Sequence, residues 1–113
     1  MLSIMRKLMF LSVLTSINAF AFDTPAQVPI GVAVGPNTTV EVNFANMVNP
    51  EGCPYNGAYV VNPSLDRETK SMMLSTLLTA KASNQRVRVR LSGCTDRPQI
   101  IIVFLESTWI GGF

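Results

Sequence analysis

Three arginines that alternate with apolar residues are the sharpest candidates for ligand binding in this chain. They are Arg86, Arg88 and Arg90. Because side chains of a strand alternate between its two faces, Val87, Val89 and Leu91 would point to the core and the arginines would share the outer face. A row of guanidinium groups can bind carboxylates, phosphates or sialic-acid-like sugars. The alternative is a solvated outer face on which the arginines pair with Glu41 or Glu106 across the sheet.

Two tyrosines offer a second candidate ligand-binding surface. Tyr55 and Tyr59 flank the turn sequence Asn56-Gly57, close to Cys53. Aromatic side chains on an ordered loop can stack on sugar rings. The alternative is that both rings pack over a disulfide at Cys53. The candidate ligand contacts are therefore Arg86, Arg88, Arg90, Tyr55 and Tyr59.

The chain contains two cysteines, Cys53 and Cys94. An even number of cysteines in a small exported chain predicts a disulfide. Closing a loop of this length would stabilise the fold by about 4 kcal/mol in the loop-entropy model. The alternative is two free buried thiols. A zinc site is not expected, because the chain has no histidine and two distant thiolates do not complete a tetrahedral cage.

Catalysis is poorly supported by the residue types present. Without histidine, the commonest general base and the usual activator of a serine or cysteine nucleophile are missing. Asp66 and Glu68 are spaced two apart on a predicted helix, so their carboxylates would point in different directions. We therefore predict a protein that is not an enzyme and has no cofactor or metal.

The first 21 residues have the pattern of a secretory signal peptide. Arg6 and Lys7 form a basic head, an apolar run covers 8–17, and Ala19-Phe20-Ala21 provides the small residues at the cleavage site. The apolar run is about half of the ~20 residues that a membrane span needs. Removing 21 of the 113 residues leaves a mature chain of 92, which we expect to be exported to the periplasm or secreted, with no transmembrane segment.

The mature chain is formally neutral. Losing Arg6 and Lys7 reduces nine basic residues to seven, which balance seven acidic ones. Nucleic-acid binding would require a basic surface, with aromatic residues interleaved on an OB-type barrel. No aromatic residue interrupts the arginine row, so we do not expect nucleic acid as a partner.

The pattern of apolar residues predicts five strands and one helix. The expected strands are 28–34 at a sheet edge, 38–44, 58–61, 86–91 and 99–105, the last continuing towards Trp109. Residues 22–27 are expected to be a loose leader. The helix is expected over 64–83, capped by Ser64 or Asp66 and ending at Asn84. Its buried stripe would comprise Met73, Leu74, Leu77 and Leu78, with Lys81 at the edge.

This order of elements predicts a mainly β protein with one helix, an α+β fold. Three strands, one helix and two strands match an OB-like five-stranded barrel. The alternative is an open five-stranded sheet with one packed helix. Either arrangement forms a single domain over 22–113.

Three sequence runs resemble a known group of proteins. They are KSMMLSTLLTAKA at 70–82, QRVRV at 85–89 and SGC at 92–94. The chain is similar over 53–105 to small exported bacterial proteins of unassigned function and, more distantly, to the OB-fold B subunits of subtilase-type bacterial toxins. The resemblance implies an OB-like fold and glycan recognition by a ring of subunits. No sugar-contacting residue of those toxins matches a position here.

These observations predict an exported, non-enzymatic binding or assembly module. Its ligand would be a glycan, as for a toxin B subunit, or a protein, and it would form a homo-oligomer. The alternative is a periplasmic accessory or inhibitor protein that docks on one protein partner.

Overall fold

Six strands and one long helix make up the part of the chain that the computed structural model describes, residues 21–106. In chain order they are β1 (Phe22–Asp23), β2 (Gly31–Gly35), the short 3-10 helix η1 (Pro36–Thr38), β3 (Thr39–Asn43), β4 (Tyr59–Val61), α2 (Arg67–Ser83), β5 (Val87–Cys94) and β6 (Pro98–Leu105). The expected signal peptide, apart from Ala21, lies outside the described residues. So does the expected continuation of the last strand towards Trp109.

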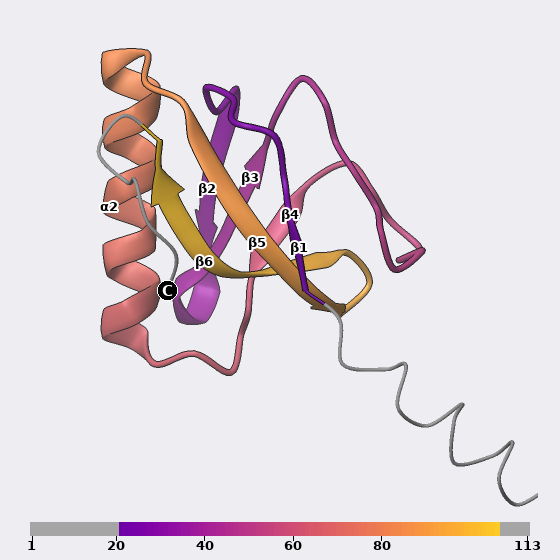
Figure 1. The fold of residues 1–113 in the computed structure, drawn as a ribbon. Helices are drawn as coiled ribbons and strands as arrows, with labels where there is room; N and C mark the ends of the chain where they lie inside the picture. Colours follow the sequence, from indigo (N-terminus) through magenta and orange to yellow (C-terminus); the bar gives the residue numbers. More distant parts are fainter. Residues whose placement is uncertain (1–20, 107–113) are drawn as a thin grey trace, which may run out of the picture.

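The strands form one sheet in the order β1-β5-β6-β4-β3-β2. Neighbouring strands are antiparallel, except for the parallel pair β4 and β6. A parallel pair needs a long crossover, and α2 together with β5 provides it. Figure 1 shows α2 standing along one side of the curved sheet.

The expected five-stranded barrel is wrong in its closure and in its number of strands, whereas the alternative of an open sheet with one packed helix is confirmed except for the number of strands. The sheet has six strands, and its edge strands β1 and β2 do not pair with each other. Both edges nevertheless come from one segment of the chain. Between them, Gln27 forms a bridge with Val87 of β5, and the Ile30 amide donates to the Asn43 carbonyl of β3 at 3.0 Å. The sheet is thus an open α+β version of the predicted OB-like arrangement.

The additional strand is β1, in the segment that we expected to be a loose leader. Two residues are too few to show the alternation of a strand. Contacts with β5 hold it instead: the Thr24 amide donates to the Val89 carbonyl at 2.9 Å, and the Val89 amide donates to Thr24 Oγ1 at 3.1 Å. Thr24 is almost completely buried as a result.

The core lies between the sheet and α2, and the predicted alternation places its residues correctly. Val40 and Val42 of β3 are buried, and so are Val87, Val89 and Leu91 of β5. The buried cluster as a whole is Val40, Val42, Phe44, Tyr59, Val61, Leu77, Ala80, Val87, Val89, Leu91 and Ile100.

Helix α2 begins later than expected and buries a slightly different stripe. Asp66 caps its N-terminus by accepting from the Thr69 amide at 2.8 Å, and Asn84 ends it in the left-handed conformation. The Lys70 stem is buried, and its Nζ donates to the Asn37 carbonyl at 3.1 Å. The buried stripe therefore includes Lys70, Leu77 and Ala80, whereas the expected Leu78 is half exposed.

No helix among residues 21–106 has the length and apolar character needed to cross a membrane.

Candidate functional site

The arginine row lies on the outer face of β5, but two of its members are already engaged by acidic side chains. Arg90 makes a two-pronged contact with Asp23 at 2.6 and 3.1 Å, while Arg88 Nε donates to Glu106 at 2.7 Å. Both guanidinium groups also lie over the Phe104 ring, 4.7 and 5.3 Å from its centre. The hydrogen bond from Arg90 lowers the pKa of Asp23, which keeps this pair charged.

Arg86 is not part of this cluster. Its side chain is exposed just before β5, and no ion pair joins it to any other residue in the described range. Its carbonyl accepts from the Glu106 amide at 3.0 Å. The three arginines therefore do not form one continuous cationic site. The anticipated pairing with Glu106 is present for Arg88, whereas Glu41 has a different partner.

The two candidate tyrosines have opposite environments. Tyr59 is fully buried in the core, where its hydroxyl accepts from the Val48 amide at 2.7 Å. Burial raises the pKa of Tyr59. Tyr55 is 46% exposed and is the tyrosine that a ligand can reach.

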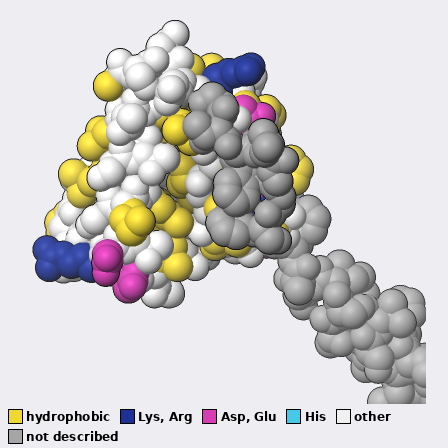
Figure 2. Space-filling model, turned by 60° about the vertical axis from the view of Figure 1, so that its left-hand side comes forward, with side chains coloured by type: hydrophobic (Ala, Val, Ile, Leu, Met, Phe, Trp, Pro, Cys, Tyr) yellow, Lys and Arg dark blue, Asp and Glu magenta, His cyan; other side chains and the backbone are white. Residues whose placement is uncertain are grey.

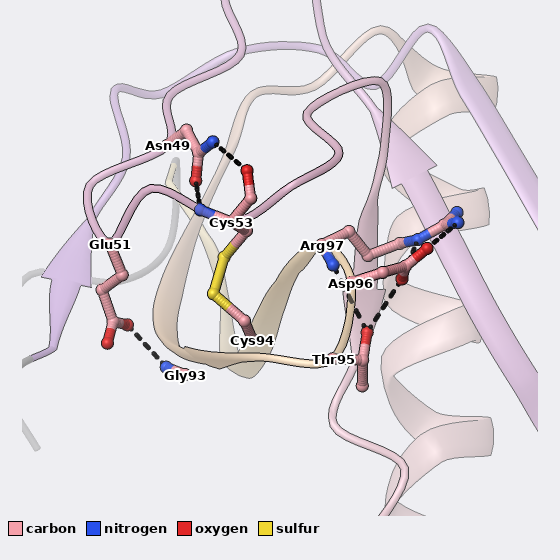
Figure 3. Close-up of a disulfide and its surroundings, with 8 residues drawn as sticks. All are labelled: Asn49, Glu51, Cys53, Gly93, Cys94, Thr95, Asp96 and Arg97. Carbon is pink, nitrogen blue, oxygen red and sulfur yellow. Dashed lines mark hydrogen bonds and ion pairs between the residues drawn. A yellow bond between two sulfur atoms is a disulfide. The ribbon is translucent and has the colours of Figure 1, made fainter.

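Tyr55 belongs to a loop that is attached firmly to the turn between β5 and β6. The predicted disulfide between Cys53 and Cys94 is confirmed, with the two Cα atoms 5.8 Å apart. Figure 3 shows Asn49 bonded to both the amide and the carbonyl of Cys53, and Glu51 accepting from the Gly93 amide. The Tyr55 amide donates to the Asp96 carbonyl at 2.8 Å.

Arg97, in that same turn, connects three separate parts of the chain. Its Nη1 donates to Glu41 of β3 at 2.6 Å, and its Nε and Nη2 donate to the Asp96 carboxylate, each at 2.8 Å. The guanidinium also lies over the Tyr55 ring, 4.4 Å from the ring centre. The hydrogen bonds between Arg97 and Asp96 lower the pKa of Asp96 strongly and raise that of Arg97. Tyr55 is thus positioned by both its backbone and its ring.

An open hollow of about 280 Å³ lies next to Tyr55, between the loop and the edge of the sheet. It is lined by Gly31, Val32, Ala33, Glu41, Val42, Asn43, Tyr55, Gly57 and Ala58. Glycines shape its walls: a Cβ at Gly57 would collide with the Tyr55 hydroxyl, and one at Gly31 would lie 2.7 Å from Asn43 Oδ1. That Asn43 oxygen is buried without a hydrogen-bond partner among the described residues.

The groups around this hollow suit a ligand that carries both hydroxyl groups and an apolar face. Glu41 supplies a carboxylate acceptor, Asn43 an amide, and Tyr55 an aromatic surface with a hydroxyl. Tyr55 could be predicted from the sequence, but Arg97 could not, because it lies in a short turn whose sequence does not show its contact with Glu41. The sequence suggested Glu41 only as a partner for the arginine row.

A second surface feature is the outer face of α2. Between Glu68 and Lys81, the only charged side chain of this helix is the buried Lys70. Met72 is 65% exposed and Leu78 49% exposed. Figure 2 shows mainly uncharged and apolar side chains along this face. Beside it, a groove of about 330 Å³ is lined by Thr69, Met72, Met73, Thr76, Ile101, Ile102 and Val103.

Within residues 21–106, no three histidine, cysteine or acidic side chains are grouped so that they could hold a metal ion.

Comparison with known proteins identifies similar folds but no similar sequences. No protein-family model and no curated protein matches the chain. A cholera toxin-like B subunit from Citrobacter freundii superposes with a TM-score of 0.56 at 15% identity, covering 84% of this chain and 94% of that one. The porcine E. coli heat-labile enterotoxin B-pentamer, solved in complex with Lacto-N-neohexaose, gives 0.57 at 13% identity, with coverage of 84% and 94%.

A third structure gives the same result. The B subunit of human heat-labile enterotoxin from E. coli superposes with a TM-score of 0.56 at 13% identity, covering 90% of this chain and 96% of that one. The chain therefore shares its fold with bacterial toxin B subunits, the distant similarity that its sequence indicated.

Proposed function

We propose that this protein is an exported, non-enzymatic module that binds glycans in the hollow beside Tyr55. The observation that carries the proposal is the Tyr55 ring, half exposed and backed by Arg97, next to Glu41 and Asn43. A sugar can place a face of its ring on the tyrosine while its hydroxyl groups bond to the acidic and amide side chains. One protein of similar fold was solved with an oligosaccharide, Lacto-N-neohexaose.

The position of Tyr55 favours binding because little order has to be gained when a ligand arrives. The disulfide, the Asn49 contacts and the Asp96 carbonyl hold the loop before any ligand is present. Preorganisation of this kind improves affinity by reducing the entropy lost on binding. Of the five candidate contacts, we keep Tyr55. The engaged Arg88 and Arg90 act as structural residues of the β1–β5 edge, and Tyr59 as a core residue.

Replacing Tyr55 with alanine should weaken glycan binding about tenfold or more, because a stacked aromatic surface contributes roughly the 1.4 kcal/mol that a factor of ten represents. The measurement is the apparent Kd on a glycan array. Arg86→Ala is the control, since Arg86 is also exposed but lies just before β5 and does not line the hollow. Equal loss of binding in both variants would contradict the assignment of the site.

We further propose that copies of the protein associate through the uncharged outer face of α2. Exposed apolar groups gathered beside a groove are typical of protein contact surfaces, and one protein of similar fold is a pentamer. The same face also suits the alternative function, docking on a single protein partner. Native mass separates the two: a multiple of the chain mass together with glycan binding supports the first. A monomer that captures one protein supports the second.

For export, we propose cleavage after Ala21. Phe22 would then be the first residue of the mature chain, and it is also the first residue of β1, so the cut would leave the sheet complete. The disulfide is in keeping with an oxidising compartment. Intact mass of the protein from the exported fraction should equal that of 22–113. A species that retains 1–21 would overturn this proposal.

A further inference from the structure

We infer that the hollow beside Tyr55 selects uncharged or amine-bearing saccharides and rejects those that present a carboxylate, as sialylated chains do. This inference rests on the proposed glycan-binding function and concerns the ligand class. The sequence suggested a positively charged arginine row that binds acidic sugars. The present inference instead places the ligand at a site with a net negative charge.

The first step is that the cation beside the hollow, Arg97, already has two acidic partners. Within the described residues, Arg97 is the one basic side chain in contact with Tyr55 and with Glu41. Its Nη1 is directed to Glu41 at 2.6 Å, and its Nε and Nη2 are directed to Asp96 at 2.8 Å each. A guanidinium has five N–H groups, so two are left for a ligand, but a carboxylate that reached them would lie close to the two carboxylates already bound to Arg97.

The second step is the net charge of the cluster that Glu41, which lines the hollow, forms with Arg97 and Asp96. Glu41 and Asp96 carry two negative charges against the single positive charge of Arg97. Arg97 holds the pKa of Asp96 well below its ordinary value, so that carboxylate stays ionised at neutral pH. The cluster is therefore net negative, and about a third of the Glu41 side chain remains exposed to a ligand.

The third step is that no other cation of β5 can offset this charge. Arg88 and Arg90 are paired with Glu106 and Asp23 on the outer face. Arg86 precedes β5, whereas Arg97 follows its end. At ~3.3 Å per residue, the length of β5 separates Arg86 from Arg97 by about 25 Å. This distance is well beyond the ~8 Å over which charges act in physiological salt.

The remaining groups match a neutral polyol. Glu41 can accept hydrogen bonds from hydroxyl or ammonium groups, and the Asn43 side chain adds an amide. The buried Asn43 Oδ1 has no donor among the described residues, and the Tyr55 hydroxyl can both donate and accept. A second anion in this environment would be repelled by the Glu41 carboxylate.

The test is an array of immobilised oligosaccharides in which each neutral chain has its sialylated counterpart. We expect the wild-type protein to bind each neutral chain at least tenfold more tightly than its sialylated counterpart. Raising the salt concentration should narrow this difference, because the repulsion is screened. Glu41→Gln should also narrow the difference in affinity, since it removes the negative charge that repels an incoming carboxylate while keeping an acceptor for Arg97. Glu68→Gln, on the exposed start of α2, is the matched control and should change nothing.

Equal or tighter binding of the sialylated chains by the wild type would overturn the inference but leave the glycan-binding function standing. Failure to bind any chain would overturn the function, and the inference with it. The affinities of the wild type for neutral and sialylated chains at two salt concentrations are sufficient to test the inference. The test therefore does not depend on correct folding of the Glu41 variant.

Discussion

Val89→Asp is expected to unfold the domain. Val89 is completely buried in the middle of β5, between β1 and β6. An aspartate there would be an unpaired charge in the core, and the cost of burying it exceeds ~4 kcal/mol, which is comparable with the total stability of a small domain. Far-ultraviolet circular dichroism should show loss of the sheet, and the cooperative melting transition should disappear.

Arg88→Ser, at the neighbouring position, is the control for that experiment. Arg88 faces outward, so the variant should fold. It loses a partly exposed ion pair with Glu106 and uncovers the Phe104 ring, which together cost about 1 kcal/mol. A melting curve in which Arg88→Ser is as damaging as Val89→Asp would contradict the observed faces of β5.

Cys94→Ala should lower the free energy of unfolding by about 2–5 kcal/mol, the usual effect of removing a native disulfide from a small domain. The bond joins residues 41 positions apart and is the covalent link between the Tyr55 loop and the end of β5. Urea denaturation with and without reductant provides the measurement. Wild-type protein in reductant should behave like the variant, while the variant itself should be insensitive to reductant. Two alkylatable thiols in native, unreduced wild type would contradict this prediction.

The elements with one buried face could be predicted well from the sequence. In β3 and β5, strict alternation identified both the strands and their inward residues, because shifting a strand by one residue would expose its whole apolar set. The end of α2 was also predictable, since Asn84 adopts the left-handed conformation that asparagine tolerates. These features depend on near neighbours in the chain, which a sequence displays directly.

The features that were missed depend on distant contacts. β1 consists of two residues and is held by Arg90, which is 67 positions away from Asp23. The charge cluster beside Tyr55 joins Glu41 to Arg97, 56 positions apart. No local pattern reports such pairings, so the sequence could suggest Tyr55 but not the partners that place it. Tyr59 is buried because it lies in β4, next to the core, whereas Tyr55 lies in an exposed loop. The turn sequence between the two tyrosines does not show this difference.

The location of the two cysteines has a consequence for how the chain folds. The segment between them contains β4, α2 and all of β5 except its last residue, which is Cys94 itself. Two cysteines allow one intramolecular pairing, so oxidation cannot trap a wrong isomer and no reshuffling step is needed. A bond that forms early would close the loop and reduce the entropy still to be lost when the parallel neighbours β4 and β6 meet. A chain with this single pair would thus need an oxidant to form its bond, but not a disulfide isomerase.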